Sequence, residues 1–268
     1  QYAMHQRAMH VVDRIYGLLE YSNSQHYPHF SKEGQGRGKI GTTGFLLGLF
    51  GGFHAATFMA SIASLFVLSE GFQLYAKIMA MWSFYVAALC VFHFLEFFST
   101  ALFQPSTLSY DSYVVNHSKE YTIAAIASFF EFWIESLMFG RYKSSMHWVV
   151  IAGITSIIIG QATRTTAMWQ CGDNFSHKIV DKKLACHRLV THGIYSILRH
   201  PSYFGWFYWS IGTQLVLCNP ICFLFYSITV WRFLNDRISY EEDILKHFFP
   251  SEYEAYMRST IIGIPFLT

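Results

Sequence analysis

Residues 189–206 combine the start signal of a helix with side chains that could bind an anion. Pro201 suits the first turn of a helix, where its missing amide hydrogen is harmless. The amides that follow it and the positive end of the helix could receive an anion, such as the carboxylate of a cofactor. Arg199 and His200 directly precede this turn and could add charge-assisted hydrogen bonds. A capped helix with Arg199 at the lipid headgroups is the alternative interpretation.

A second candidate for chemistry lies further along the chain, at Arg237 and Glu241. Residues at this spacing project from one face of a helix, so both side chains could act at one place. Arg232 and Asp236 have the same spacing. Each pair could equally be a salt bridge at the membrane interface, which contributes little to stability. Spacing alone therefore leaves a structural and a functional interpretation open.

Ionisable residues also lie inside apolar runs, at His93, Glu96, Glu131 and Glu135. Because charges at membrane depth are costly, they are candidates for a metal site or for the proton relay of a transporter. The sequence shows neither the histidine boxes of desaturases nor an inverted repeat, so packing between helices is the favoured interpretation. The expected hydrophilic loop holds further potential ligands, whose spacing matches no common zinc finger: Cys171, His177, Cys186, His187 and His192. No metal is therefore expected.

The composition indicates an integral membrane protein. Of 268 residues, 53% are hydrophobic and 19% aromatic, but only 13% are charged. A soluble domain carries about 25% charged residues. The net charge of +2 also argues against a strongly cationic surface, so nucleic acid is not an expected partner.

The apolar runs predict about six membrane spans. Four approach or exceed the roughly 20 residues that cross a bilayer. The last two are joined by Asn219-Pro220, a turn signal that predicts an antiparallel helical hairpin. The first run is either one long helix or a helix broken near Gly51-Gly52, and the fourth is expected to end before Arg164. The expected runs are 40–68, 74–98, 121–139, 147–162, 203–217 and 221–233.

These runs divide the chain into three expected parts. Residues 1–38 are largely polar and include a candidate amphipathic helix. Residues 39–169 hold the transmembrane helices. Residues 170–268 hold a hydrophilic loop, the Asn-Pro hairpin and an amphipathic C-terminal helix. The predicted fold class is all-α, a polytopic transmembrane bundle.

The order of motifs in the C-terminal third resembles the isoprenylcysteine carboxyl methyltransferases. It runs from Arg-His-Pro-x-Tyr-x-Gly-Trp through the Asn-Pro hairpin to Arg-x-x-x-Glu-Glu, and closes with Phe-Phe-Pro-x-x-Tyr-x-x-Tyr and Gly-Ile-Pro. The match is nearly continuous over 174–266 and extends more loosely through 93–96 and 108–120. The resemblance implies that residues 170–268 are the catalytic region, on the cytosolic side of the membrane. Members of this family commonly have eight spans, so six to eight are expected. The polar residues 1–38 depart from the hydrophobic start that is usual in the family.

The resemblance implies that S-adenosylmethionine binds in one pocket and leaves as S-adenosylhomocysteine. The matched cofactor-binding residues are His187, Leu189, Val190, Tyr195, His200, Pro201, Ser202, Tyr203 and Glu241. Arg237 matches the position that the family uses toward the prenylcysteine carboxylate, and is the expected catalytic and substrate-binding residue. Its guanidinium could hold a carboxylate without losing its charge. A general base is not needed, because the carboxylate is already an anion.

The resemblance also implies the partners and the membrane. Substrates would be proteins with a prenylated C-terminal cysteine, such as small GTPases, methylated in the last step of CaaX processing. The prenyl chain would arrive through membrane lipid, while the cofactor arrives from water. The family resides in the endoplasmic reticulum, and the basic residues of the expected loop agree with a cytosolic active site: Lys178, Lys182, Lys183 and Arg188. A related membrane methyltransferase for another lipid is the alternative, and a transporter is a more distant one.

Overall fold

The computed structural model describes residues 37–115, 118–177, 179, 183 and 188–268. This part of the chain contains seven α-helices: α2 (Arg37–Ser64), α3 (Glu70–Phe103), α4 (Lys119–Ser145), α5 (His147–Cys171), α6 (Pro201–Leu217), α7 (Pro220–Phe248) and α8 (Pro250–Ser259). The two long connections, between α3 and α4 and between α5 and α6, include 3-10 helices. The candidate amphipathic helix within residues 1–38 lies outside the described residues.

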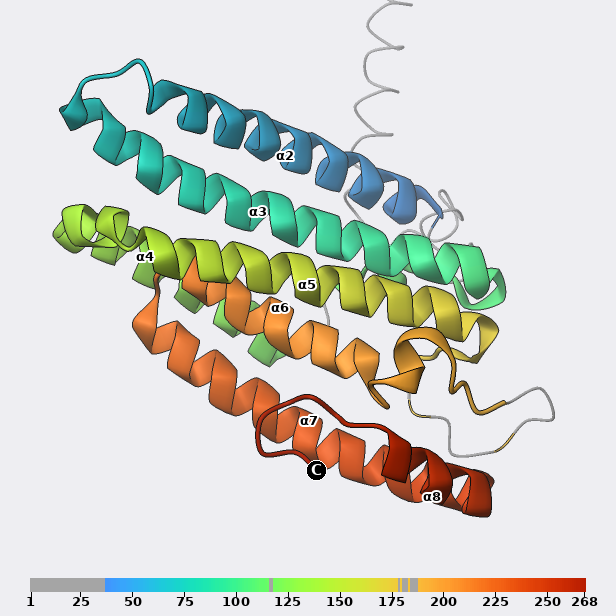
Figure 1. Ribbon diagram of the computed structural model, residues 1–268. Coiled ribbons are helices and arrows are strands. Elements are labelled where there is room, and N and C mark those ends of the chain that lie inside the picture. Colours follow the sequence, from blue (N-terminus) through green and yellow to red (C-terminus); the bar gives the residue numbers. More distant parts are fainter. Residues whose placement is uncertain (1–36, 116–117, 178, 180–182, 184–187) are drawn as a thin grey trace, which may run out of the picture.

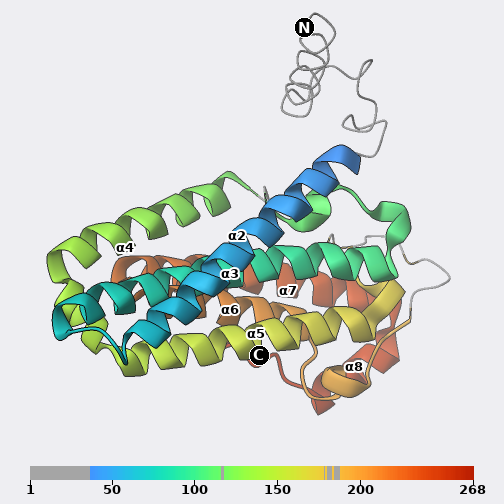
Figure 2. The ribbon, with the colours of Figure 1, turned by 90° about the horizontal axis from the view of Figure 1, so that it is seen from above.

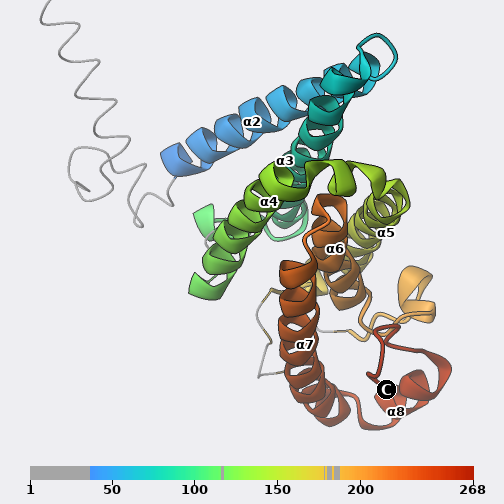
Figure 3. The ribbon, with the colours of Figure 1, turned by 90° about the vertical axis from the view of Figure 1, so that its left-hand side faces the viewer.

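The long helices lie side by side, with α6 between α5 and α7 (Figures 1 and 3). Helix α2 packs on α3 at one edge of the bundle, and α3 lies between α4 and α5 in Figure 2. At the other edge, α8 and the C-terminal segment fold back beside α7, where the indole of Trp231 donates to the carbonyl of Pro265 at 2.7 Å. The described residues form no named strand. The predicted all-α architecture is confirmed.

Four helical segments are long and apolar enough to cross a membrane: Arg37–Ser64, Glu70–Phe103, Lys119–Ser145 and His147–Asn174. Large apolar side chains on α2 face outward, with Phe45 and Phe53 exposed to 68% and 64%. Such exposure along apolar helices suits a surface that faces lipid. Helices α6 and α7 form the predicted hairpin, which turns at Cys218 and Asn219. The fold is therefore a multi-pass helical one.

The structure tests three predictions about where helices end or break. Helix α2 is continuous through Gly51 and Gly52, so the first run is one helix. The expected end of the fourth span before Arg164 was wrong, because α5 continues to Cys171 and buries the arginine at 8% exposure. The charge of Arg164 is tolerated there because it forms an ion pair with Glu96 of α3. The expected C-terminal helix is divided in two, with Pro250 at the start of α8.

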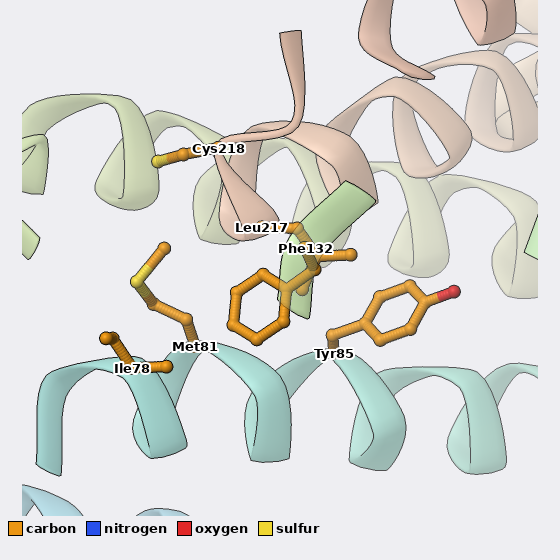
Figure 4. Close-up of a cluster of buried hydrophobic side chains, with 6 residues drawn as sticks. All are labelled: Ile78, Met81, Tyr85, Phe132, Leu217 and Cys218. Carbon is orange, nitrogen blue, oxygen red and sulfur yellow. The ribbon is translucent and has the colours of Figure 1, made fainter. Parts of the chain in front are cut away.

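A cluster of buried side chains holds the hairpin at the end of the bundle remote from the predicted site (Figure 4). Its members come from α3, α4 and the end of α6: Ile78, Met81, Tyr85, Phe132, Leu217 and Cys218. The ring of Trp82 stacks on Phe132 with centroids 5.5 Å apart. Because lipid chains are as apolar as these residues, close packing rather than exclusion of water holds such helices together.

Glycines bring α5 and α6 into close contact. A Cβ atom on Gly160 would lie 2.6 Å from the carbonyl oxygen of Gly205, and one on Gly205 would lie 2.5 Å from that of Gly160. Small residues allow helix backbones to approach in this way. One turn beyond Gly160 comes Arg164, which thereby reaches the first turn of α6. This contact positions the site described next.

Candidate active site

A cavity of about 820 Å³ lies at the end of the bundle where α3 and α5 finish and α6 starts. Its walls come from these helices, from segments 107–114, 174–177 and 188–195, and from α7 and α8. Figure 1 places the start of α6, the end of α5 and α8 at this same end of the molecule. Ligand pockets in proteins have volumes of about 300–1,000 Å³. The cavity could therefore hold a ligand of cofactor size.

The predicted site residues that the structure describes all line this cavity. They are Leu189, Val190, Tyr195, His200, Pro201, Ser202, Tyr203, Arg237 and Glu241. The remaining predicted residue, His187, lies outside the described residues. The start of α6 follows directly on the segment that carries Leu189 and Val190, and α7 returns from the hairpin to bring Arg237 and Glu241 beside them. Their roles stay predictions, but the fold brings them together.

Tyr203 bridges the predicted pair on α7. The Arg237 Nε donates to the hydroxyl oxygen of Tyr203 at 2.8 Å, and this hydroxyl donates to Glu241 Oε2 at 2.5 Å. The guanidinium also lies 5.5 Å from the centroid of the Tyr203 ring. Arg237 and Glu241 thus both contact Tyr203 of α6, instead of forming a surface salt bridge with each other. A guanidinium has further N–H donors, which a carboxylate could use.

A buried ion pair lies behind this group. Arg164 donates from Nε and Nη2 to the two carboxylate oxygens of Glu96, both at 2.6 Å. His177 Nε2 contacts Glu96 Oε2 at 2.8 Å, and Arg164 Nη1 donates to the Ser202 hydroxyl at 2.9 Å. Arg164, Glu96 and His177 were not predicted as site residues from the sequence. The signal that could have found this pair is an acid inside one apolar run, Glu96, and an arginine just after the end of another, Arg164, because buried charges require partners.

Arg199 and His200 both contact a carboxylate of the chain itself, which differs from the anion binding expected of them. Arg199 Nε donates to Glu242 Oε1 at 2.6 Å, and His200 Nε2 contacts the same oxygen at 3.1 Å. Burial raises the pKa of Glu242, but the hydrogen bonds from His200 and Arg199 outweigh it and hold this pKa below its usual value. The carboxylate therefore stays ionised and neutralises Arg199. Glu242 was not predicted as a site residue from the sequence.

Helix α6 begins at Pro201, as predicted. The amides of Tyr203 and Phe204 both donate to the carbonyl of His200, at 3.1 and 3.0 Å. The expected anion site at this helix end therefore has fewer available donors than the sequence indicated. Recognition of a ligand here depends more on side chains than on backbone amides.

Tyrosines enclose another side of the cavity. Tyr195 donates to the carbonyl of Ala167 at 3.2 Å, and its own carbonyl accepts from the hydroxyl of Tyr256 at 2.6 Å. Burial raises the pKa of both phenols above the usual value, so both hydroxyls remain protonated donors. Tyr253 and Tyr256 of α8 line the cavity and were not predicted. Their spacing in the C-terminal tail was noted only as a family motif.

The remaining acids within the apolar runs have partners that hold the bundle together. Glu131 accepts from the amides of Ile221 and Cys222 at 2.7 Å each, and so caps α7. Glu135 pairs with Lys143 at 2.9 Å. His93 contacts the carbonyl of Tyr113 and the hydroxyl of Tyr121, at 2.9 and 3.0 Å. These contacts agree with packing between helices, and the part of the chain that the structure describes contains no group of ligands arranged for a metal ion.

Comparison with known proteins identifies relatives across the same region. The model of the isoprenylcysteine carboxyl methyltransferase (ICMT) family matches residues 151–247. The protein-S-isoprenylcysteine O-methyltransferase of Rattus norvegicus is 47% identical over 183 residues, which make up 68% of this chain and 64% of that relative. The enzyme of the same name from Dictyostelium discoideum is 42% identical over 181 residues, 68% of this chain and 76% of the relative. The chain thus spans 64% of the length of the rat relative.

A solved structure extends the likeness beyond the C-terminal region. It is described as the eukaryotic intramembrane Ras methyltransferase ICMT without a monobody. The two structures superpose with a TM-score of 0.70 at 36% sequence identity, and the match covers 85% of this chain and 82% of the other. The match therefore extends well beyond residues 151–247. The chain belongs to the isoprenylcysteine carboxyl methyltransferase family.

Proposed function

We propose that this chain transfers a methyl group from S-adenosylmethionine to the α-carboxylate of a C-terminal prenylated cysteine. The products would be the cysteine methyl ester and S-adenosylhomocysteine. Family membership and the names of the relatives support this reaction. The observation that carries it is the convergence of Arg237, Glu241 and segment 189–203 on one cavity.

The residues around the cavity fit the cofactor by their chemistry. S-adenosylmethionine presents an apolar adenine face, ribose hydroxyls and a cationic sulfonium. Leu189 and Val190 offer apolar contact to the base. Carboxylates and aromatic faces attract cations, and Glu241, Tyr195 and Tyr203 provide them here. These residues would hold the cofactor on the α6 side of the cavity.

The side chains of this chain supply alignment and a dry environment. Arg237 would hold the cysteine carboxylate by its remaining N–H donors, and its role is positional because a strong clamp would weaken the nucleophile. The apolar walls at Phe92, Trp206 and Phe233 would exclude water from the carboxylate. Bound S-adenosylmethionine supplies an electrophilic methyl group, so a carboxylate oxygen gains the methyl carbon as the carbon–sulfur bond breaks.

We further propose where the enzyme works. Helices α6 and α7 would enter the membrane as a hairpin beside the four longer helices, within a total of six to eight spans. Residues 39–169 would form the transmembrane part, 170–268 the catalytic region, and 1–38 a polar N-terminal segment. The membrane would be that of the endoplasmic reticulum, with the cavity facing the cytosol. Prenylated proteins of the small GTPase class are the proposed partners, as the description of the solved Ras methyltransferase suggests.

The test is transfer of a labelled methyl group from S-adenosylmethionine to N-acetyl-S-farnesylcysteine by the purified protein in detergent. N-acetylcysteine is the matched control without the lipid. Base-labile label on the farnesylated compound alone is the expected result. If phosphatidylethanolamine accepted the label instead, the proposal would be wrong and a phospholipid methyltransferase would take its place.

A further inference from the structure

We propose that Glu96, Arg164 and His177 are positioning residues, which hold the guanidinium of Arg237 in the orientation that the substrate carboxylate requires. This inference rests on the proposed function, because it concerns how that site is assembled. The three residues connect the membrane-embedded helices α3 and α5 to the residue expected to act on the substrate.

The first step is the ion pair between α3 and α5. The side chain of Glu96 is 1% exposed and that of Arg164 is 10% exposed. Two parallel contacts at 2.6 Å make a bidentate fork, which permits one relative orientation of the two groups. Burying such a pair costs desolvation energy that well-packed apolar side chains would avoid. An ion pair at this place is therefore better explained by the geometry that it enforces than by a gain in stability.

The second step leads from the ion pair to the loop after α5. A carboxylate only accepts hydrogen bonds, so His177 Nε2 donates to Glu96 Oε2, at 2.8 Å. The His177 ring also meets the edge of Phe175, with centroids 5.2 Å apart. His177 lies beyond the end of α5, where helical hydrogen bonds no longer fix the backbone. Its tether to the buried carboxylate therefore sets the position of its own main-chain carbonyl.

The third step leads from this carbonyl to Arg237. Nη2 of Arg237 donates to the oxygen of His177 at 2.6 Å, while Nε donates to the hydroxyl of Tyr203 at 2.8 Å. Two bonds from different nitrogens of a planar guanidinium fix its orientation. Arg164 supports the second bond as well, because it donates to the hydroxyl and the carbonyl of Ser202, at 2.9 and 3.3 Å. Both contacts of Arg237 are thus supported by the same ion pair.

The experiment is a double-mutant cycle between His177 and Arg237. His177→Ala leaves the Glu96–Arg164 pair and the main-chain carbonyl in place, so the protein should still fold. We expect kcat with N-acetyl-S-farnesylcysteine to fall about tenfold, because small misplacements of an aligning group are costly. The dissociation constant for S-adenosylhomocysteine should change by less than about twofold, because the cofactor side of the cavity is unaltered. His177→Gln, whose amide can donate to Glu96, should recover most of the turnover.

The cycle separates positioning from a general structural effect. In the Arg237→Lys protein, which lacks the guanidinium fork, His177→Ala should cause almost no further loss of turnover. His247→Ala makes the same substitution at an exposed position of α7 and should behave like the parent in both backgrounds. Equal fractional losses in the two backgrounds, or parental turnover of His177→Ala, would overturn the positioning role. A parent protein that transfers no methyl group to the farnesylated compound would instead overturn the proposed function, so the two failures differ.

Discussion

At the scale of residues, Arg237 lies where polar contacts from two parts of the fold meet. Its Nε donates to Tyr203 of α6, and its Nη2 donates to the carbonyl of His177. A family motif predicted both Arg237 and Tyr203, but the contact between them and the contact with His177 come from the tertiary structure. The expected role of Arg237 in holding the substrate can be tested separately from cofactor binding, because most of the predicted cofactor-binding residues lie in segment 189–203.

Arg237→Ala is expected to reduce kcat/KM for N-acetyl-S-farnesylcysteine about 100-fold, because alignment of the carboxylate is lost. S-adenosylhomocysteine should still bind, which titration calorimetry would measure. Arg232→Ala is the matched control, since Arg232 is exposed on the same helix and does not line the cavity. Undiminished turnover of the Arg237 variant would show that another group holds the substrate.

Glu242 gives a second prediction at this scale. Its pKa is lowered in the folded protein, so its contribution to stability is present above its unfolded pKa of about 4.3 and is lost as the pH falls through the folded value. We expect the Tm of the parent in detergent to fall between pH 5 and pH 3 by more than that of Glu242→Gln. Asp243→Asn, at the exposed neighbouring position, should retain the parental pH dependence. A parental profile for Glu242→Gln would contradict the assigned ion pairs.

At the scale of elements, the contact between α5 and α6 determines the geometry of the site. The two helices meet at Gly160 and Gly205, and a second close approach joins Gly153 to Gly212. From the same face of α5, Arg164 reaches Ser202 on α6. A change in the distance between these helices would therefore move the ion pair relative to the first turn of α6.

Gly160→Ala tests this dependence. Its Cβ would meet backbone atoms of Gly205 and Trp209 at 2.6 Å, and overpacking of this kind costs about 1–3 kcal/mol. We expect a lower Tm and reduced turnover in the variant, measured by thermal unfolding in detergent and by methyl transfer. Gly52→Ala is the control, because a Cβ there meets nothing within 4 Å. A Gly160 variant as stable and active as the parent would show that α5 and α6 can separate without consequence.

At the scale of the whole molecule, the helices have two distinct ends. The turn between α2 and α3 lies at one end, and the cavity with α8 lies at the other (Figure 1). If the cavity faces the cytosol, the turn at 65–69 must face the lumen of the endoplasmic reticulum. The proposed orientation can therefore be measured without any assay of activity.

An N-glycosylation acceptor on a flexible Gly-Ser spacer, inserted after Val67, is expected to be glycosylated in cells. The same insert after Asp173, at the cavity end, should remain unmodified, because glycosylation occurs only on the lumenal side. Sensitivity of the electrophoretic shift to an endoglycosidase provides the measurement. Glycosylation at 173 but not at 67 would reverse the proposed topology.

The sequence by itself determined the local features of this protein. Apolar length predicted the long helices, Asn219-Pro220 predicted the hairpin, and Pro201 predicted the start of α6. The family motif pointed to residues that the fold does gather around one cavity. These features depend on neighbouring residues, turn chemistry and helical spacing, which a single sequence displays directly.

Only the tertiary structure decided which charges are partners. Arg164 and Glu96 are 68 positions apart, and Arg199 and Glu242 are 43 apart. The sequence placed Arg164 beyond the end of a span and left Arg199 free for an anion, because a hydrophobic pattern does not specify which helix packs against which face. That choice depends on close backbone contacts such as Gly160 against Gly205, and on the need of each buried charge for an opposite charge.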